Sequence, residues 1–322
     1  MKGISLIALF IDNIRNLGRR DKLKLLMLAA EDAGVCSLGP EDACRFLKGY
    51  LSAEKETIAS VAETVDMIIE KCRQNNIKII TYPDSRYPPL LRDIYDPPAA
   101  LYVRGGMYDF SSAAIAVVGT RRATGRALKA AYETGFVLGS ENTVVVSGLA
   151  SGIDSEAHRG CLDGMGVTAA VLGNGLDSVY PPANRKLASK ILEQGGVLIS
   201  EYPPGAPPLK HHFPERNRII SGLAGSLILI QAPEKSGALI TAGYAADEGR
   251  DVYIHRDGLG SIQGAGGKIL AENGAEIISL FRDSAYRVNS NGGLTDPKLI
   301  EDEILGKIVN NKGTYYRRKV YA

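Results

Sequence analysis

Residues 114–125 read AIAVVGTRRATG, and residues 144–154 read VVVSGLASGID. In each, a short apolar run ends in a loop rich in Gly, Ser, Thr or Arg, and a stretch of helical character follows. Similar apolar runs lie at residues 77–80, 168–172, 197–199, 227–230, 252–254 and 276–278. Runs that are continuously apolar are typical of parallel strands covered on both faces. Helical stretches between them indicate right-handed βαβ units. The sequence therefore predicts a doubly wound, mostly parallel sheet of the α/β class.

The segments on either side of the sheet have different patterns. Residues 1–80 carry apolar residues at helical spacing, which predicts a small all-α domain. We expect its helices near residues 23–30, 40–47 and 58–72. The sheet domain is then expected over residues 81–283, with a linker and a short tail over residues 284–322. The tail could form a helix over residues 298–309.

Composition sets broad limits on the function. The chain has 38 Lys and Arg residues against 36 Asp and Glu residues, a net charge of +2. Such a balance neither predicts nor excludes nucleic-acid binding, so the positions of the arginines must decide. The four cysteines are far apart and form no C-x-x-C pair, which favours reduced core thiols in a reducing compartment.

The N-terminus has a short apolar run that resembles part of a signal peptide. Asp12 and Arg15 interrupt this run early, and no cleavage site of small residues follows. No run of about 18 apolar residues occurs elsewhere, so we expect no membrane span. The prediction is a cytoplasmic protein.

Four loops at the carboxyl ends of the predicted strands are rich in Gly, Ser and Thr: residues 119–125, 147–154, 173–182 and 231–241. In doubly wound sheets, ligands bind at this edge. Glycines let backbone amides approach an anion, and the following helix N-terminus adds partial positive charge. The loops therefore favour an anion-binding rim, although tight turns between strand and helix require glycine in any case.

Known nucleotide-binding motifs do not match these loops. Arg121 stands where G-x-G-x-x-G needs its second glycine, and no G-x-x-x-x-G-K-[ST] motif occurs. We therefore predict no NAD, no ATP and no other cofactor.

The segment PPLKHHFPERNRIIS (residues 207–221) has the most specific chemistry. Arg216 and Arg218 flank Asn217 and follow Lys210 and Phe213. Arginine binds phosphate oxygens in a bidentate manner, and an exposed aromatic ring can stack on an unpaired base. The alternative is a salt-bridged arginine pair with a core phenylalanine.

The four histidines do not form a metal motif. His211 and His212 are adjacent, His255 is isolated, and no H-E-x-x-H spacing occurs, so we predict no metal. His158 follows Asp154 by four residues, and the two side chains could form a catalytic pair. A helix-capping role for Asp154 is the simpler interpretation, and no G-x-S-x-G nucleophile motif accompanies it.

Several further segments, taken with these, resemble one family in the order of their motifs. They are VGTRR (118–122), SGLASGID (147–154), SEYPP (200–204), FPERNRIIS (213–221), SGALITA (236–242) and the upstream DPPAALY (96–102). Together they cover roughly residues 80–280 and resemble the DNA-processing protein A family, also called DprA or Smf.

This resemblance implies a Rossmann-like domain, preceded by a small domain similar to sterile-alpha-motif domains. It implies that the chain binds single-stranded DNA, forms homodimers through the Rossmann-like domain and loads the RecA recombinase onto incoming strands in natural transformation. By position, the implied DNA pocket consists of Arg121, Arg122, Ser147, Gly148, Gly152, Tyr180, Lys210, Phe213, Arg216, Asn217, Arg218, Ser236 and Gly237.

The sequence departs from the family pattern in three places. Only a short tail follows residue 284, so the family's C-terminal winged-helix domain is expected to be absent or vestigial. The usual Val-Pro-Gly after the strand at residues 252–254 is replaced by HRDG (residues 255–258). Gln231 stands where an acidic residue is common.

An enzyme is the main alternative. Phosphoribohydrolases of nucleoside monophosphates use a similar sheet-edge pocket, with a Gly-Gly-x-Gly-Thr loop and a catalytic glutamate. Here the loop is KSGALIT (residues 235–241), and no glutamate follows until Glu248. The sequence thus favours a DNA-binding protein without catalysis, while a purely scaffolding member of the family remains a third interpretation.

Overall fold

The computed structural model describes residues 3–14, 17–31, 55–106, 113–279, 308–311 and 314–317. The helix predicted over residues 40–47, two of the four cysteines and nearly all of the linker lie outside these ranges. Of the helix predicted over residues 298–309, only the last two residues are described, and they belong to a strand. That strand, β10 (Ile308–Asn311), pairs antiparallel with β11 (Thr314–Arg317).

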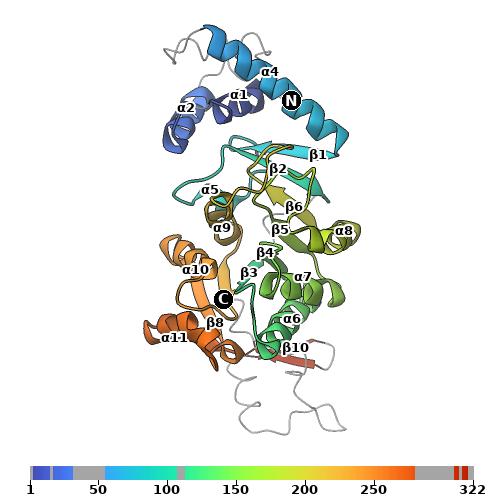
Figure 1. Cartoon of the computed structure of the whole chain (residues 1–322), viewed down its shortest axis with the longest axis vertical. Helices are drawn as coiled ribbons and strands as arrows, with labels where there is room; N and C mark the ends of the chain where they lie inside the picture. Colours follow the sequence, from blue (N-terminus) through green and yellow to red (C-terminus); the bar gives the residue numbers. More distant parts are fainter. Residues whose placement is uncertain are drawn as a thin grey trace.

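A nine-stranded sheet forms the centre of the molecule (Figure 1). Its strands are β1 (Ile77–Thr81), β2 (Ala100–Gly105), β3 (Ala114–Val118), β4 (Val144–Ser147), β5 (Thr168–Val171), β6 (Val197–Ser200), β7 (Ser226–Leu229), β8 (Asp251–His255) and β9 (Glu276–Ile278). They lie in the order β1-β2-β6-β5-β4-β3-β7-β8-β9. All neighbours from β6 to β9 are parallel, whereas β1 and β2 form an antiparallel edge. The prediction of a doubly wound, mostly parallel sheet is confirmed, although β2 was not predicted.

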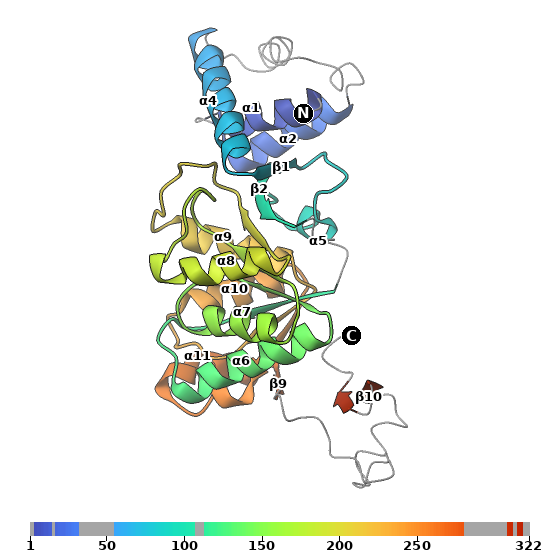
Figure 2. The same ribbon diagram turned by 90° about the vertical axis from the view of Figure 1, so that its right-hand side faces the viewer.

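Helices cover both faces of the parallel strands (Figure 2). One layer consists of α6 (Gly125–Ser140), α7 (Ile153–Asp163) and α8 (Arg185–Glu193), and the other of α9 (His212–Gly222), α10 (Gly237–Asp247) and α11 (Ala265–Glu272). Strand β3 shows why its sequence is continuously apolar. Ile115 and Val117 pack with α6 and α7, whereas Ala116 and Val118 pack with α9 and α10. Because both faces of the strand are buried, each of its side chains is apolar.

The N-terminal helices pack against the antiparallel edge of the sheet (Figure 1). They are α1 (Gly3–Asp12), α2 (Arg19–Glu31) and α4 (Lys55–Gln74), and a short helix α5 (Pro89–Arg92) follows β1. Ile7 and Leu9 of α1 are fully buried in the same core as Tyr102 of β2. The helical character predicted near residues 23–30 and 58–72 is present in α2 and α4. The domain boundary at residue 80 stays a prediction.

Among the described residues, no helix combines the length and apolar character needed to span a membrane. Cys72 and Cys161 are unpaired and buried, and burial raises the pKa of each thiol to about 12. Since the reactive form is the thiolate, these two cysteines are chemically inert core residues.

Candidate nucleic-acid interface

The chain reverses direction across the sheet between β3 and β7. It proceeds outward from β3 through β4, β5 and β6, and then returns through α9 to β7 on the other side of β3. This is the topological switch point at which doubly wound sheets bind ligands. Helix α9 therefore begins beside the carboxyl ends of the central strands. We call the loops at these ends, together with the first turn of α9, the rim.

Three side chains from distant segments meet on the rim. The guanidinium carbon of Arg121, after β3, lies 5.5 Å from the ring centroid of Phe213 in α9. The ring of Tyr180, after β5, lies 5.5 Å from Phe213 between centroids, tilted by 45°. Tyr180 is 41% exposed, and Arg121 and Lys210 are exposed as well. An accessible aromatic surface bordered by cations is the combination that binds bases by stacking and phosphates by charge.

The ring of Phe213 is positioned by the backbone of the loop after β5. A Cβ added at Gly173 would lie 3.2 Å from the Phe213 ring, so the ring rests directly on this backbone. The neighbouring His212 has Nδ1 3.1 Å from the carbonyl oxygen of Gly173, and its ring stacks on Tyr202 at 3.7 Å. The aromatic surface is thus preorganised, which lowers the entropy cost of binding. His212 and Tyr202 were not singled out from the sequence, because their partners lie in distant loops.

Arg216 lies beneath the rim and is 4% exposed. Its guanidinium donates to the carbonyl oxygens of Gly148, at 3.0 Å, and Val171, and so joins the ends of β4 and β5. Burial lowers the pKa of Arg216 to about 10, and the nearby charge of Asp154 opposes this shift. Asp154 accepts hydrogen bonds from the backbone amides of Gly148 and Ala150, at 3.2 and 3.4 Å. Burial raises the pKa of Asp154, and the charge of Arg216 counteracts it. Arg216 therefore holds the rim loops together in this structure.

Arg218 does not lie with the exposed rim residues. It is 3% exposed and forms two hydrogen bonds to the carboxylate of Glu201, at 2.8 and 2.6 Å. It also donates to the carbonyl and a carboxylate oxygen of Asp96, at 2.9 and 3.1 Å. Arg19 of α2 reaches the same Asp96 and also Glu215 of α9. Arg218 thus faces the N-terminal helices, as in the salt-bridged alternative considered from the sequence.

Asn217 connects α9 to the start of α10. Its side-chain amide donates to the carbonyl oxygen of Gly237 at 3.1 Å. Ser236 caps α10, accepting from the backbone amide of Ala238 at 3.2 Å. Ser236 is partly exposed and Gly237 is exposed, so the N-terminus of α10 opens onto the rim.

The remaining candidates shape the loops after β3 and β4. Ser147 is fully buried, and its hydroxyl donates to the carbonyl oxygen of Val117 at 2.6 Å. Gly152 has a φ of +88°, and a Cβ there would lie 2.6 Å from the carbonyl oxygen of Thr120. Only glycine fits such a position, where two loops cross. Arg122 is exposed beside them.

Two departures from the family pattern meet at one place. Gln231 is 2% exposed, and its amide oxygen accepts from the backbone amide of Thr124 at 2.9 Å. Its amide nitrogen lies 3.4 Å from the carbonyl oxygen of Gly258 and 3.2 Å from the hydroxyl of Ser261. A carboxylate could accept but not donate here. The glutamine therefore matches the HRDG loop at residues 255–258.

The catalytic alternatives lack a suitable geometry among the described residues. His158 is fully buried, with Nδ1 2.6 Å from the hydroxyl oxygen of Thr168, and burial lowers its pKa to about 3. Glu248 follows the last residue of α10, at the opposite end of that helix from Ser236. Burial raises the pKa of Glu248 to about 7. No group of three or more His, Cys, Asp or Glu side chains in the described ranges could hold a metal ion.

Comparison with known proteins shows the family to which the chain belongs. The family model described as DNA recombination-mediator protein A matches residues 78–289. The chain belongs to this family. It is 41% identical over 214 residues to the Smf protein of Synechocystis sp., with 65% of this chain and 54% of that protein covered. It is 34% identical to the Smf protein of Borreliella burgdorferi, with 92% and 91% covered. The chain spans about half the length of the Synechocystis and Escherichia coli Smf proteins.

Solved structures of relatives share the fold. The DNA processing protein A of Streptococcus pneumoniae superposes with a TM-score of 0.71 at 32% identity, covering 85% of this chain and 95% of that one. The Helicobacter pylori protein superposes with a TM-score of 0.57 at 25% identity, covering 71% and 96%. The latter structure concerns the binding of single-stranded DNA by that protein.

Proposed function

We propose that the chain binds single-stranded DNA on the rim and acts in DNA recombination. The observation that carries this proposal is the cluster of exposed Arg121 and Tyr180 with the partly exposed Phe213. The rings offer a stacking surface that every base can use, and the arginine and Lys210 supply charge for the backbone. Binding of this kind tolerates any sequence and weakens as salt rises.

The proposal extends to a mediator role without catalysis. The protein would protect incoming strands, form a homodimer in the cytoplasm and load RecA onto the DNA during natural transformation or another recombination task. Membership of the recombination-mediator family supports this role. The two catalytic candidates considered from the sequence do not lie on the rim: His158 is fully buried and Glu248 follows the far end of α10, which supports binding over hydrolysis.

Fluorescence anisotropy with labelled single-stranded and duplex oligonucleotides, across a salt series, tests the proposal. Stacking on one aromatic contributes about 1–3 kcal/mol per base, so Phe213→Ala should weaken single-strand binding by roughly 5- to 150-fold. Phe213→Tyr keeps the stacking face and should bind nearly as the wild type does. Arg121→Ala and Lys210→Ala should each reduce the log–log salt slope by about 0.7.

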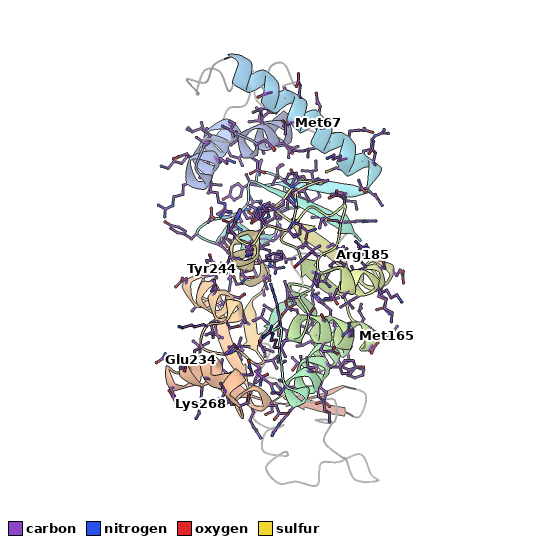
Figure 3. All side chains as sticks on the ribbon, in the orientation of Figure 1. Met67, Met165, Arg185, Glu234, Tyr244 and Lys268 are labelled. Atoms are coloured by element: carbon purple, nitrogen blue, oxygen red, sulfur yellow. The ribbon has the colours of Figure 1, made fainter. Side chains whose placement is uncertain are left out.

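Lys268→Ala is a matched control, because this exposed lysine of α11, labelled in Figure 3, is not one of the proposed DNA-binding residues. Its salt slope should equal that of the wild type. Equal affinity of the wild type for duplex and single strand, or no binding at low salt, would refute the proposed function.

A further inference from the structure

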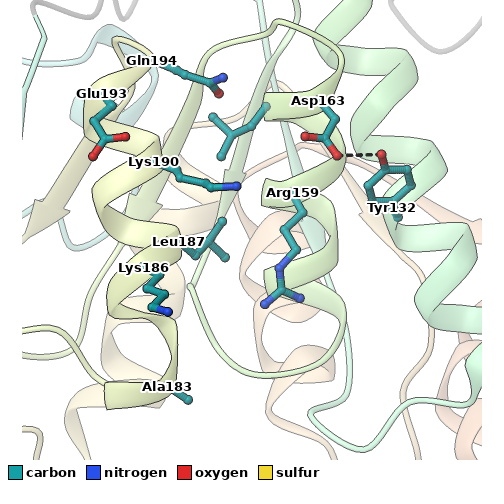
Figure 4. Close-up of a pocket in the computed structure, with 10 residues that line it drawn as sticks. Tyr132, Arg159, Asp163, Ala183, Lys186, Leu187, Lys190, Glu193 and Gln194 are labelled. Carbon is teal, nitrogen blue, oxygen red and sulfur yellow. Dashed lines mark hydrogen bonds between the residues drawn. The ribbon is translucent and has the colours of Figure 1, made fainter.

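A groove runs between α7 and α8, on the helical layer opposite α9 (Figure 4). Its volume is about 490 Å³. Its lining consists of Tyr132, Arg159, Leu162, Asp163, Ala183, Lys186, Leu187, Lys190, Glu193 and Gln194. None of these residues belongs to the cluster of Arg121, Tyr180 and Phe213, and none was predicted to bind DNA from the sequence.

Charge is distributed unevenly along the groove. Lys186 of α8 and Arg159 of α7 lie in the half that begins at Ala183, Lys190 lies beyond Leu187, and Glu193 lies with Asp163 at the other end (Figure 4). The Asp163 carboxylate accepts a hydrogen bond from the hydroxyl of Tyr132 at 2.7 Å.

The cations of the groove are available to an anion. Lys186 and Lys190 are exposed. Arg159 pairs with Glu156, but its side chain is 47% exposed. Exposed ion pairs contribute only about 0–1 kcal/mol, so an incoming anion can replace Glu156 as the partner.

The basic half of the groove is continuous with the rim. Ala183 belongs to the short 3₁₀ turn Pro182–Asn184, which begins two residues after Tyr180. Asn184 is buried and donates to the carbonyl oxygen of Leu149, at 2.8 Å, and to the hydroxyl of Ser155, at 3.0 Å. These bonds fix the start of α8 against the loop after β4. A strand that leaves Tyr180 therefore meets the basic half first.

We propose that this groove carries the phosphodiester backbone of a DNA strand away from the rim, an inference that rests on the proposed function. The nine residues of α8 span about 13 Å, so the groove is long enough to pass more than one phosphate of a single strand. The acidic far end marks where the strand leaves the groove.

The lining favours a phosphate backbone over a protein segment. The floor residues Leu162 and Leu187 are only 3% and 5% exposed, so the groove offers little apolar area for a docking helix. Helix-in-groove recognition depends on apolar anchors in hydrophobic grooves. A strand that tracks a basic groove requires charge alone.

The test compares two lengths of labelled oligonucleotide, because only the longer can reach the groove. Site sizes of about 4–16 nucleotides are usual for single-strand binders, so lengths of about 6 and about 18 nucleotides are appropriate. Lys186→Ala/Lys190→Ala removes two phosphate contacts. It should reduce the log–log salt slope for the longer strand by about 1.4, which is roughly 50-fold in affinity at about 50 mM salt. Binding of the shorter strand should not change.

The matched control is Lys78→Ala/Lys268→Ala, which removes the same charge from exposed positions on β1 and α11. Both double variants should melt as the wild type does, since all four lysines are exposed. If the groove variant binds both lengths with wild-type affinity, or loses equal affinity for both, the groove does not carry the strand. Either result leaves the proposed binding on the rim unaffected. If the wild type binds neither length, the proposed function itself fails. Binding of fluorescent polyglutamate that depends on the two lysines, with DNA binding unaffected, would also overturn the inference in favour of an acidic protein partner.

Discussion

Replacing Arg216 by methionine distinguishes a buried organising role from direct contact with DNA. The change removes the hydrogen bonds to Gly148 and Val171 and leaves the carboxylate of Asp154 buried without its nearby cation. Removing the buried cation leaves the Asp154 charge uncompensated and two carbonyl oxygens without their donor, and a loss of this kind costs about 3–5 kcal/mol. Methionine has a similar length and fills most of the space, so a cavity should add little. We expect Arg216→Met to lower the free energy of unfolding by about 3–5 kcal/mol.

A double-mutant cycle tests whether Asp154 is the electrostatic partner. Asp154→Asn keeps an oxygen that can accept from the amides of Gly148 and Ala150 but removes the charge. The combined variant with Arg216→Met should be more stable than the sum of the two single effects predicts. Charged residues that interact in one network show coupling of about 0.5–3 kcal/mol, and we expect the upper half of this range. Urea unfolding followed by circular dichroism measures each corner, with the slope m held constant.

The opposite result is equally clear. If Arg216→Met unfolds at the wild-type urea midpoint yet loses single-strand binding, the guanidinium contacts DNA directly and the buried arrangement is wrong for the bound protein. If the changes in the free energy of unfolding of the two substitutions are strictly additive, Asp154 is not the electrostatic partner of Arg216. Arg216→Lys keeps the charge but not the paired donors, and should fall between the wild type and Arg216→Met.

Three further predictions concern buried groups. Burial raises the pKa of Asp12 to about 6, so between about pH 4 and pH 6 the folded chain holds a proton that the unfolded chain releases, and stability falls as the pH rises. Above pH 6, Asp12→Asn should therefore raise the thermal midpoint, with a gain of at most about 3 kcal/mol in the free energy of unfolding. At pH 4 it should have little effect, and equal effects at both pH values would refute the raised pKa of Asp12 as the cause. His158 should stay neutral in NMR titrations down to about pH 4, because burial lowers its pKa to about 3. Its contribution to stability is complete above pH 6.5 and is lost as the pH falls. An NMR titration of the His158 ring near pH 6.5 would contradict this. In Gly148→Ala the new Cβ would lie 2.7 Å from Nη2 of Arg216 and 2.8 Å from Oδ2 of Asp154. We therefore expect the free energy of unfolding, measured in urea, to fall by about 1–3 kcal/mol. Wild-type stability would show that both side chains can move aside.

The central sheet could be predicted because its pattern is set by its own residues. Parallel strands buried on both faces must be apolar throughout, and this requirement is visible in the sequence. Strand β2 was not predicted, although its run Ala100–Val103 is apolar. Its strand character depends on pairing with β1 and β6, at separations that the local sequence does not specify.

The exposed and buried parts of the candidate site differed in how far they could be predicted. The grouping of Arg121, Tyr180 and Phe213 was implied by the family resemblance, and the prediction that the loops of Arg121 and Tyr180 lie at the carboxyl ends of strands agreed with it. The burial of Arg216 and Arg218 did not follow, because their partners come from elsewhere in the chain. An arginine in a basic segment has the same sequence pattern whether it faces a phosphate or a carbonyl. The three-dimensional partners decide which.

Helix α9 connects the rim to the N-terminal part of the chain through its two faces. Phe213 and Arg216 are three residues apart and share one face, as Glu215 and Arg218 share another. The first face positions the stacking ring and ties the loops after β4 and β5. The second carries ion pairs to Glu201 and to Arg19 of α2. Burial acts to raise the pKa of Glu215, but the charge and hydrogen bond of Arg19 outweigh it and lower the pKa. The carboxylate therefore stays ionised, and α2 is attached to the helix that presents Phe213. Arg19 therefore links α2 to the face of α9 that does not carry Phe213, and the N-terminal helices support this helix without lying on the rim.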